Sequence, residues 1–156
     1  MPPNLRDEIK QRRPFANPEV EAYLNLVRTS DALVRGVERA LKPSGLTQSQ
    51  YNVLRILRGA GAEGLVCREL SERMVARDAD ITRLLDRLEA RGLATRMRDR
   101  KDRRAITLRI TVDGIRLANR LDQPIATLHR QQLSHMGAGR IRRLIRLLEE
   151  ARQGLE

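Results

Sequence analysis

The stretch that decides the fold is residues 80–110, which read DITRLLDRLEARGLATRMRDRKDRRAITLRI. Its first part carries four apolar residues at the i, i+3, i+4, i+7 spacing of an amphipathic helix: Ile81, Leu84, Leu85 and Leu88. Gly92 stands where a left-handed residue closes a helix. The apolar period then changes from that of a helix to that of a strand over 106–110, which can pair with 94–98. The sequence therefore predicts a helix followed by a two-stranded hairpin with a charged tip at 99–103.

A long helix is predicted before this stretch. Asn17 can cap it, Pro18 suits its first position, and Pro43 ends its apolar period. Its length is about six to seven turns. A helix that long in a small chain often lies across a second subunit. Residues 1–16 show no clear period and predict a loose N-terminal arm.

Two shorter helices are predicted between the long helix and the amphipathic one. Thr47 caps the first, which ends in the glycine-rich stretch 59–64. That stretch matches G-x-G-x-x-G, but a dinucleotide site needs the motif after a strand, so we predict a helix-ending loop. Residues 65–66 suit a very short strand, and a short helix follows over 66–74. Asp78 is the expected cap of the amphipathic helix after it.

Two further helices are predicted after the hairpin. Thr111 caps the first, and Pro124 inside it predicts a kink. Glycines at 137 and 139 break the chain before a last helix. That helix is marked by four apolar residues, Ile141, Leu144, Ile145 and Leu148. The fold class expected is mainly α with a small β-hairpin wing.

This order of elements predicts one domain over residues 1–156, built on a winged helix-turn-helix. The core is residues 47–111, preceded by the arm at 1–16. Long N- and C-terminal helices at 17–46 and 112–153 flank the core. Their apolar faces have too few partners inside one chain, so we expect them to be dimerisation helices of a homodimer.

The composition indicates a polyanionic partner. The 156 residues include 31 Lys and Arg against 20 Asp and Glu, a formal net charge of +11. More than half of that net charge falls within residues 91–109. The three aromatic residues are too few for the stacking platforms of RNA and single-strand binders. Double-stranded DNA is therefore the first candidate partner, bound by the core at 47–111.

Several other classes of protein are excluded or disfavoured. No run approaches the roughly 20 apolar residues of a membrane span, and the charged start of the chain does not resemble a signal peptide. We expect a cytoplasmic protein without a membrane partner. Cys67, the one cysteine, excludes an intrachain disulfide, and a small apolar role is favoured over redox sensing. His129 and His135 have the wrong spacing for metal ligation from one helix face. No catalytic motif is found, so no enzyme, metal or cofactor is predicted.

Candidate DNA contacts lie on the polar face of the amphipathic helix and at the hairpin tip. The helix candidates are Thr82, Arg83 and Arg87, and the tip candidates are Arg100, Arg103 and Arg104. Arginine on such a helix can bind O6 and N7 of guanine in the major groove, while a basic tip can reach phosphates or a minor groove. The competing interpretation is a solvated helix face on which Asp86 pairs with Arg83 or Arg87.

Three segments match a known pattern in combination: 80–93 (DITRLLDRLEARGL), 99–104 (DRKDRR) and 108–114 (LRITVDG). In these segments, and in the order of elements over about 18–153, the chain resembles the MarR family of bacterial transcriptional regulators. The resemblance implies a winged-helix homodimer joined by its terminal helices. It also implies that Arg83 belongs to the recognition helix, that Arg104 enters the minor groove, and that a small ligand lowers DNA affinity.

Arg28 and Tyr51 are the candidate residues for an effector pocket, together with Tyr23. The competing interpretation is that the tyrosines are core residues with their hydroxyls at the surface. Asp122 is expected to be a solvated helix charge. We therefore expect a dimeric, sequence-specific, double-stranded DNA-binding transcriptional regulator, a ligand-responsive repressor of a near-palindromic operator. The alternative is a non-specific nucleoid or architectural protein, which shares the charge but does not need a shaped recognition helix.

Overall fold

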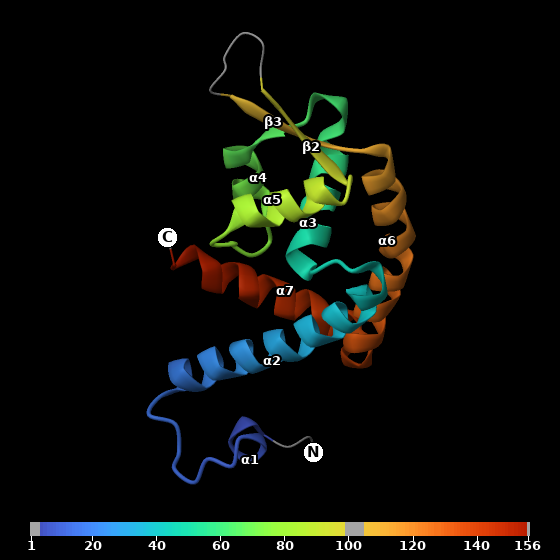
Figure 1. The fold of residues 1–156 in the computed structure, drawn as a ribbon. Coiled ribbons are helices and arrows are strands. Elements are labelled where there is room, and N and C mark those ends of the chain that lie inside the picture. The colour runs from blue at the N-terminus through green and yellow to red at the C-terminus, as the bar shows by residue number, and fades with distance from the viewer. Residues whose placement is uncertain (1–3, 99–104, 156) are drawn as a thin grey trace.

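The computed structural model of the protein describes residues 4–98 and 105–155, which are mainly helical (Figure 1). The α-helices are α1 (Leu5–Glu8), α2 (Pro18–Leu41), α3 (Gln48–Ala60), α4 (Cys67–Arg73), α5 (Ile81–Ala90), α6 (Val112–Leu133) and α7 (Ala138–Gln153). The strands are β1 (Leu65–Val66), β2 (Ala94–Arg98) and β3 (Ile106–Ile110), and 3-10 turns follow α2, α3 and α6. Figure 1 shows the strands with α3, α4 and α5 at one end of the molecule and α6 running down one side toward α2 and α7. The predicted class, mainly α with a small β wing, is confirmed.

Three helix starts follow the predicted capping. The Asn17 side chain accepts a backbone N–H of α2 at 2.9 Å. Thr47 and Gln50 form a capping box on α3, in which each side chain accepts the other residue's backbone N–H, at 3.2 and 2.9 Å. Thr111 Oγ1 accepts from the Gly114 N–H at the start of α6, at 3.0 Å. These side chains satisfy N–H groups that have no partner inside their helices.

The prediction that Asp78 caps α5 is wrong. Asp80 is the cap, because its Oδ1 accepts the Arg83 backbone N–H at 3.1 Å. Asp78 Oδ1 instead accepts the Asp80 backbone N–H at 3.0 Å, within the loop before the helix. Both side chains suit a cap, and the loop that joins α4 to α5 determines which of them reaches the first turn.

Other boundaries also differ from expectation. The arm is not wholly loose: Asn4 caps the single turn α1, and Leu5 is buried. Gly139 lies inside α7, so the break comes earlier, at Gly137, where φ is +75°. The helix α6 continues through Pro124, and the kink there stays a prediction.

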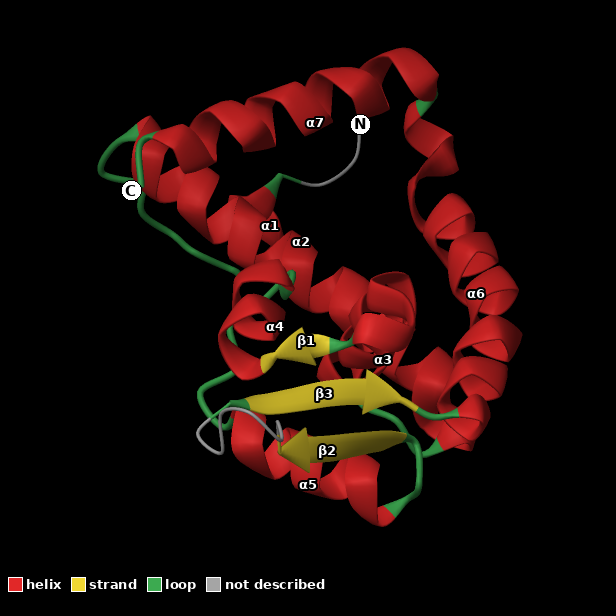
Figure 2. Ribbon diagram, turned by 90° about the horizontal axis from the view of Figure 1, so that it is seen from above, coloured by secondary structure: helices red, strands yellow, loops and turns green. Residues whose placement is uncertain are grey.

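The wing is part of a three-stranded antiparallel sheet in the order β1-β3-β2, and not a hairpin alone (Figure 2). β2 pairs with β3 from Ala94 opposite Ile110 to Arg98 opposite Ile106. The very short strand β1 pairs along the other edge of β3, with Leu65 opposite Leu108. The sequence predicted each strand, but β1 pairs with a residue 43 positions away, which no local pattern records.

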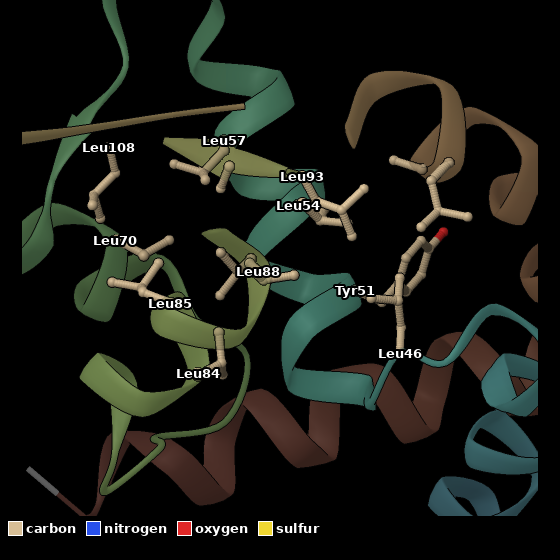
Figure 3. Close-up of a cluster of buried hydrophobic side chains, with 14 of the residues drawn as sticks. Leu46, Tyr51, Leu54, Leu57, Leu70, Leu84, Leu85, Leu88, Leu93 and Leu108 are labelled. Carbon is tan, nitrogen blue, oxygen red and sulfur yellow. The ribbon is translucent and has the colours of Figure 1, made fainter. Parts of the chain in front are cut away.

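A leucine-rich core joins α3, α4, α5 and the sheet (Figure 3). Its fully buried side chains include Leu54, Leu57, Leu70, Leu88 and Leu108. Because every element of the winged helix contributes to this cluster, the orientation of α5 is set by burial of its apolar stripe. None of the helices in residues 4–98 and 105–155 combines the length and apolar character that crossing a membrane requires.

Candidate nucleic-acid interface

The helix α5 presents a polar face to solvent, as its periodicity predicts. Leu84, Leu85 and Leu88 are buried, and Ile81 is half-buried. The opposite face carries four exposed residues: Thr82, Arg83, Asp86 and Arg87. A helix held in this way fits a major groove with its polar face toward base edges.

Arg83 and Arg87 are one helical turn apart on this face. No ion pair joins either of them to a carboxylate among residues 4–98 and 105–155. Among the described residues they have no acidic partner, and a guanidinium fork can bind guanine or phosphate with two hydrogen bonds.

The competing interpretation required Asp86 to pair with Arg83 or Arg87, and it pairs with neither. It pairs with Arg96 of β2 through Arg96 Nη2 and Asp86 Oδ1. Arg96 Nη2 also donates to the Thr82 carbonyl oxygen at 3.2 Å. Sequence reasoning counted Arg96 only as part of the basic stretch, since no local pattern shows that its strand packs against α5.

The predicted contacts at the wing tip, Arg100, Arg103 and Arg104, lie outside the described residues and stay predictions. The described part of the wing ends at Arg98, whose side chain is exposed. The structure thus brings Thr82, Arg83 and Arg87 together on one face of α5 and describes the wing up to its tip.

A cavity of about 450 Å³ lies between α2, α3 and α6, beside the loop that leads to α5. Its lining includes Tyr51, Arg55 and His129, together with Val34, Val37, Ile125 and the loop residues 74–76. Tyr51 is 5% exposed, and Arg55 stacks on its ring with the guanidinium carbon 5.8 Å from the ring centroid.

The other two pocket candidates lie elsewhere. Arg28 Nε pairs with Glu8 Oε2 of the arm at 2.6 Å, and Arg28 does not line the cavity. Tyr23 is 65% exposed on α2. Of the three residues that the sequence suggested for an effector pocket, only Tyr51 is at this cavity.

Asp122 is not the solvated charge that the sequence predicted. Its Oδ1 accepts from the Tyr51 hydroxyl at 2.7 Å, and its Oδ2 pairs with Arg58 Nη1 at 2.8 Å. Burial, and then the hydrogen bond to Asp122, raise the pKa of Tyr51 to about 12. The hydrogen bond from Arg58 holds the pKa of Asp122 below its ordinary value of 3.8.

One sequence signal could have located this cluster. Tyr51, Arg55 and Arg58 recur at i, i+4 and i+7 on α3, a polar stripe on a helix that is otherwise largely buried. Such a stripe indicates a polar contact with another element. The partner element, α6, could not be identified because it lies about 70 residues further along the chain.

The cysteine and the two histidines, all within the described residues, do not lie together. Cys67 is the first residue of α4, is half-buried and packs against the core. His129 lines the cavity, whereas His135 lies in the turn after α6. Across the part of the chain that the structure describes, no three His, Cys, Asp or Glu side chains gather as metal ligands would.

Known proteins match this chain in both sequence and fold. A model of the MarR family matches residues 46–106. The crystal structure of a MarR transcription factor from Planctomyces limnophilus is 38% identical, with a TM-score of 0.68, and covers 87% of this chain and 98% of that one. The homoprotocatechuate degradative operon repressor of Escherichia coli is 28% identical over 125 residues, which are 80% of this chain and 83% of the repressor.

The fold extends to more distant structures. A mutant MarR from E. coli, crystallised with operator DNA, has a TM-score of 0.79 at 22% identity, over 89% of this chain and 99% of that one. Fold and interface together define a winged helix-turn-helix protein with an exposed, basic helix face. The chain belongs to the MarR family of transcriptional regulators.

Proposed function

We propose that this chain is a dimeric repressor that binds double-stranded DNA sequence-specifically at a near-palindromic operator. The observation that carries the proposal is the exposed face of α5, where Arg83 and Arg87 stand without an ion pair to any described carboxylate. Two relatives support it: the E. coli repressor named above, and E. coli MarR with its operator DNA. In this proposal Thr82, Arg83 and Arg87 contact bases in the major groove.

The tip of the wing completes the interface in the proposal. Arg100 and Arg103 bind phosphates, and Arg104 enters the minor groove. The unit that binds DNA is residues 47–111, and 17–46 and 112–153 hold the dimer together. The proposal includes a cytoplasmic location, because a bacterial operator lies on the chromosome.

The dimer is supported by apolar side chains that the chain itself leaves uncovered. The first half of α2 exposes Val20, Tyr23, Leu26 and Val27. In α7 no residue is buried, and Ile145 and Leu147 are about half exposed. A second copy would cover these faces and would place two recognition helices about 34 Å apart, in successive major grooves.

An effector is proposed at the cavity that contains Tyr51. Because the cavity borders the loop 74–76 just before α5, an occupant can change the position of the recognition helix. Arg28, which pairs with the arm, is not included in this site.

The test is a fluorescence-anisotropy titration at about 0.15 M salt, where exposed charges are well screened. A labelled duplex that the protein enriches from a random-sequence pool competes against excess random duplex. We expect the enriched duplex to remain bound. Equal displacement by any duplex would overturn sequence-specific binding and favour the non-specific alternative.

The variant Arg83→Ala links this test to α5. We expect it to weaken binding by about 1–3 kcal/mol and to relax sequence preference. Arg35→Ala is the control, because Arg35 is an exposed arginine on α2 that pairs only with Asp31 among the described carboxylates, at 2.9 Å. Unchanged discrimination in Arg83→Ala would remove Arg83 from the base contacts.

A further inference from the structure

Arg96 lies in the middle of β2, opposite Leu108 of β3, and its side chain crosses from the sheet to α5. Figure 2 shows α5 alongside β2. The side chain is only 28% exposed. An arginine that serves mainly as a phosphate contact would be expected to extend into solvent, so this partly covered position indicates a different role.

The guanidinium of Arg96 contacts one stripe of α5 through two hydrogen bonds and one longer ion pair. Nη2 donates to the Thr82 carbonyl oxygen at 3.2 Å and pairs with Asp86 Oδ1, and Nε lies 3.7 Å from Glu89 Oε2. Positions 82, 86 and 89 are spaced i, i+4 and i+7, so this stripe runs along most of the helix. One side chain of the wing is therefore hydrogen-bonded to two successive turns of α5, at Thr82 and Asp86, and lies within ion-pair distance of Glu89 in the next.

The charge of Arg96 also matters for the neighbouring arginines. Asp86 is exposed on the same face as Arg83 and Arg87, three residues from one and next to the other. Without Arg96, Asp86 is free to pair with Arg83 at i, i+3 spacing and carries a negative charge toward phosphates. With Arg96 in place, that carboxylate is neutralised from the side of the sheet.

We infer that Arg96 is a positioning residue for DNA recognition: it ties the wing to α5 and neutralises Asp86, so that Arg83 and Arg87 remain available to the duplex. The inference rests on the proposed function. It assigns Arg96 no contact with DNA, although Arg96 lies in the most basic stretch of the chain.

The experiment measures affinity and its salt dependence for the duplex that the wild-type protein enriches from a random pool, with random duplex as competitor. Four variants are compared: Arg96→Gln, Arg96→Lys, Asp86→Asn and the double variant Arg96→Gln/Asp86→Asn. Arg35→Gln is the control, since it removes one charge from an exposed ion pair on α2. Thermal unfolding of each variant is recorded alongside.

We expect Arg96→Gln to bind the enriched duplex about tenfold or more weakly, the range of a lost charge-assisted hydrogen bond, with an unchanged salt slope. Asp86→Asn should bind as the wild type does, because its amide oxygen still accepts from Arg96. The double variant should regain most of the affinity that Arg96→Gln loses. Arg96→Lys should fall between, because its ammonium keeps the positive charge but has no second nitrogen in the place of Nε, which lies near Glu89.

Two results would overturn the inference. A salt slope that falls by about 0.9, with no recovery in the double variant, would make Arg96 a phosphate contact. If Arg96→Gln keeps the affinity and the sequence discrimination of the wild type, Arg96 has no role in positioning the DNA contacts. If Arg96→Gln does not fold, Arg96→Lys is compared with a further variant, Arg96→Lys/Asp86→Asn. The inference is then overturned if this double variant binds the enriched duplex no more tightly than Arg96→Lys does. If the wild type itself fails to discriminate, the proposed function fails, which is a separate outcome.

Discussion

At the residue scale, Gly64 is a position where packing leaves no room for a side chain. It precedes β1 with φ +72° and ψ −167°, a backbone region that is essentially restricted to glycine. A Cβ there would overlap the Leu108 carbonyl oxygen and lie 2.7 Å from Arg109 Cγ. We expect Gly64→Ala to lower the free energy of unfolding by about 2–4 kcal/mol, by strain and overpacking together. Urea unfolding of the variant and the wild type measures this difference in the free energy of unfolding.

Gly59 provides the matched control for Gly64→Ala. It lies in α3 with ordinary helical backbone, and a Cβ there would meet nothing within 4 Å. Gly59→Ala should therefore raise stability by up to about 1 kcal/mol. If both alanine variants had the same effect, the close approach of β1 and β3 at Gly64 would not be limiting.

The shifted pKa values of Tyr51 and Asp122 predict opposite pH dependences of the stability of the fold. The folded pKa of Tyr51, about 12, is above the ordinary value of 10.0, so its contribution to stability is complete below pH 10 and is lost as the pH rises toward 12. The pKa of Asp122 is below its ordinary 3.8, so its contribution is present above that pH and is lost as the pH falls through the lowered pKa.

The tyrosine can be titrated directly. In a Tyr23→Phe background Tyr51 is the only tyrosine, and we expect its phenolate absorbance to appear near pH 12. Asp122→Asn should lower this pKa, because the hydrogen bond and the negative charge of Asp122 both raise it. An unchanged titration in Asp122→Asn would contradict the pairing of Tyr51 with Asp122.

At the scale of elements, Thr111 links the turn after α5 to the start of α6. Its Oγ1 accepts the Gly114 N–H that begins α6 and donates to the Gly92 carbonyl oxygen in the turn after α5, at 2.6 Å. We expect Thr111→Ala to cost about 1–2 kcal/mol of unfolding free energy, the loss of a cap plus a tie between helices. Thr111→Ser keeps the hydroxyl and should retain most of the stability. Thermal unfolding compares the two, and equal losses would mean that the methyl group matters and not the hydroxyl.

The elements themselves were largely predictable because their signals are local. The caps Asn17, Thr47 and Thr111, the apolar stripe of α5 and the alternation of β3 each depend on residues within a few positions. Where two neighbours suited the same role, as Asp78 and Asp80 did, the sequence could not choose between them.

The contacts between elements could not be predicted, since they join residues distant in sequence. The sequence predicts that Asp122 is a surface charge on α6, but in the structure it contacts Tyr51 and Arg58 of α3. The sequence shows Arg96 only as one cation of the basic stretch, whereas in the structure the sheet positions it beside Asp86. In both cases the residue type was known and its partner was not. The candidate DNA face was predictable because it depends on the period of a single helix.

At the scale of the whole molecule, α2 is divided between two roles. Its second half packs on α6, where the Gln132 side chain donates to the Leu33 carbonyl oxygen at 3.1 Å, and Gly36 and Val37 are buried. Its first half pairs with the arm, through Arg28 and Glu8. The exposed apolar residues of that half are the ones that a second copy would cover.

Val27, in the first half of α2, is therefore a test of the dimer. It is 49% exposed in the chain, so Val27→Glu should leave the monomer's fold intact. In a dimer the new carboxylate would be buried without a partner, and we expect association at least about tenfold weaker, measured by sedimentation. Binding to a palindromic duplex should fall with it, because two half-sites are then no longer bound together. Val112→Glu is the control, since Val112 is 63% exposed at the first position of α6, where a carboxylate is favourable. That end of α6 lies beside the sheet and away from α2 and α7 (Figure 1), so it is not expected in the interface. If Val27→Glu sediments like the wild type and Val112→Glu, the first half of α2 is not in the interface between the two copies.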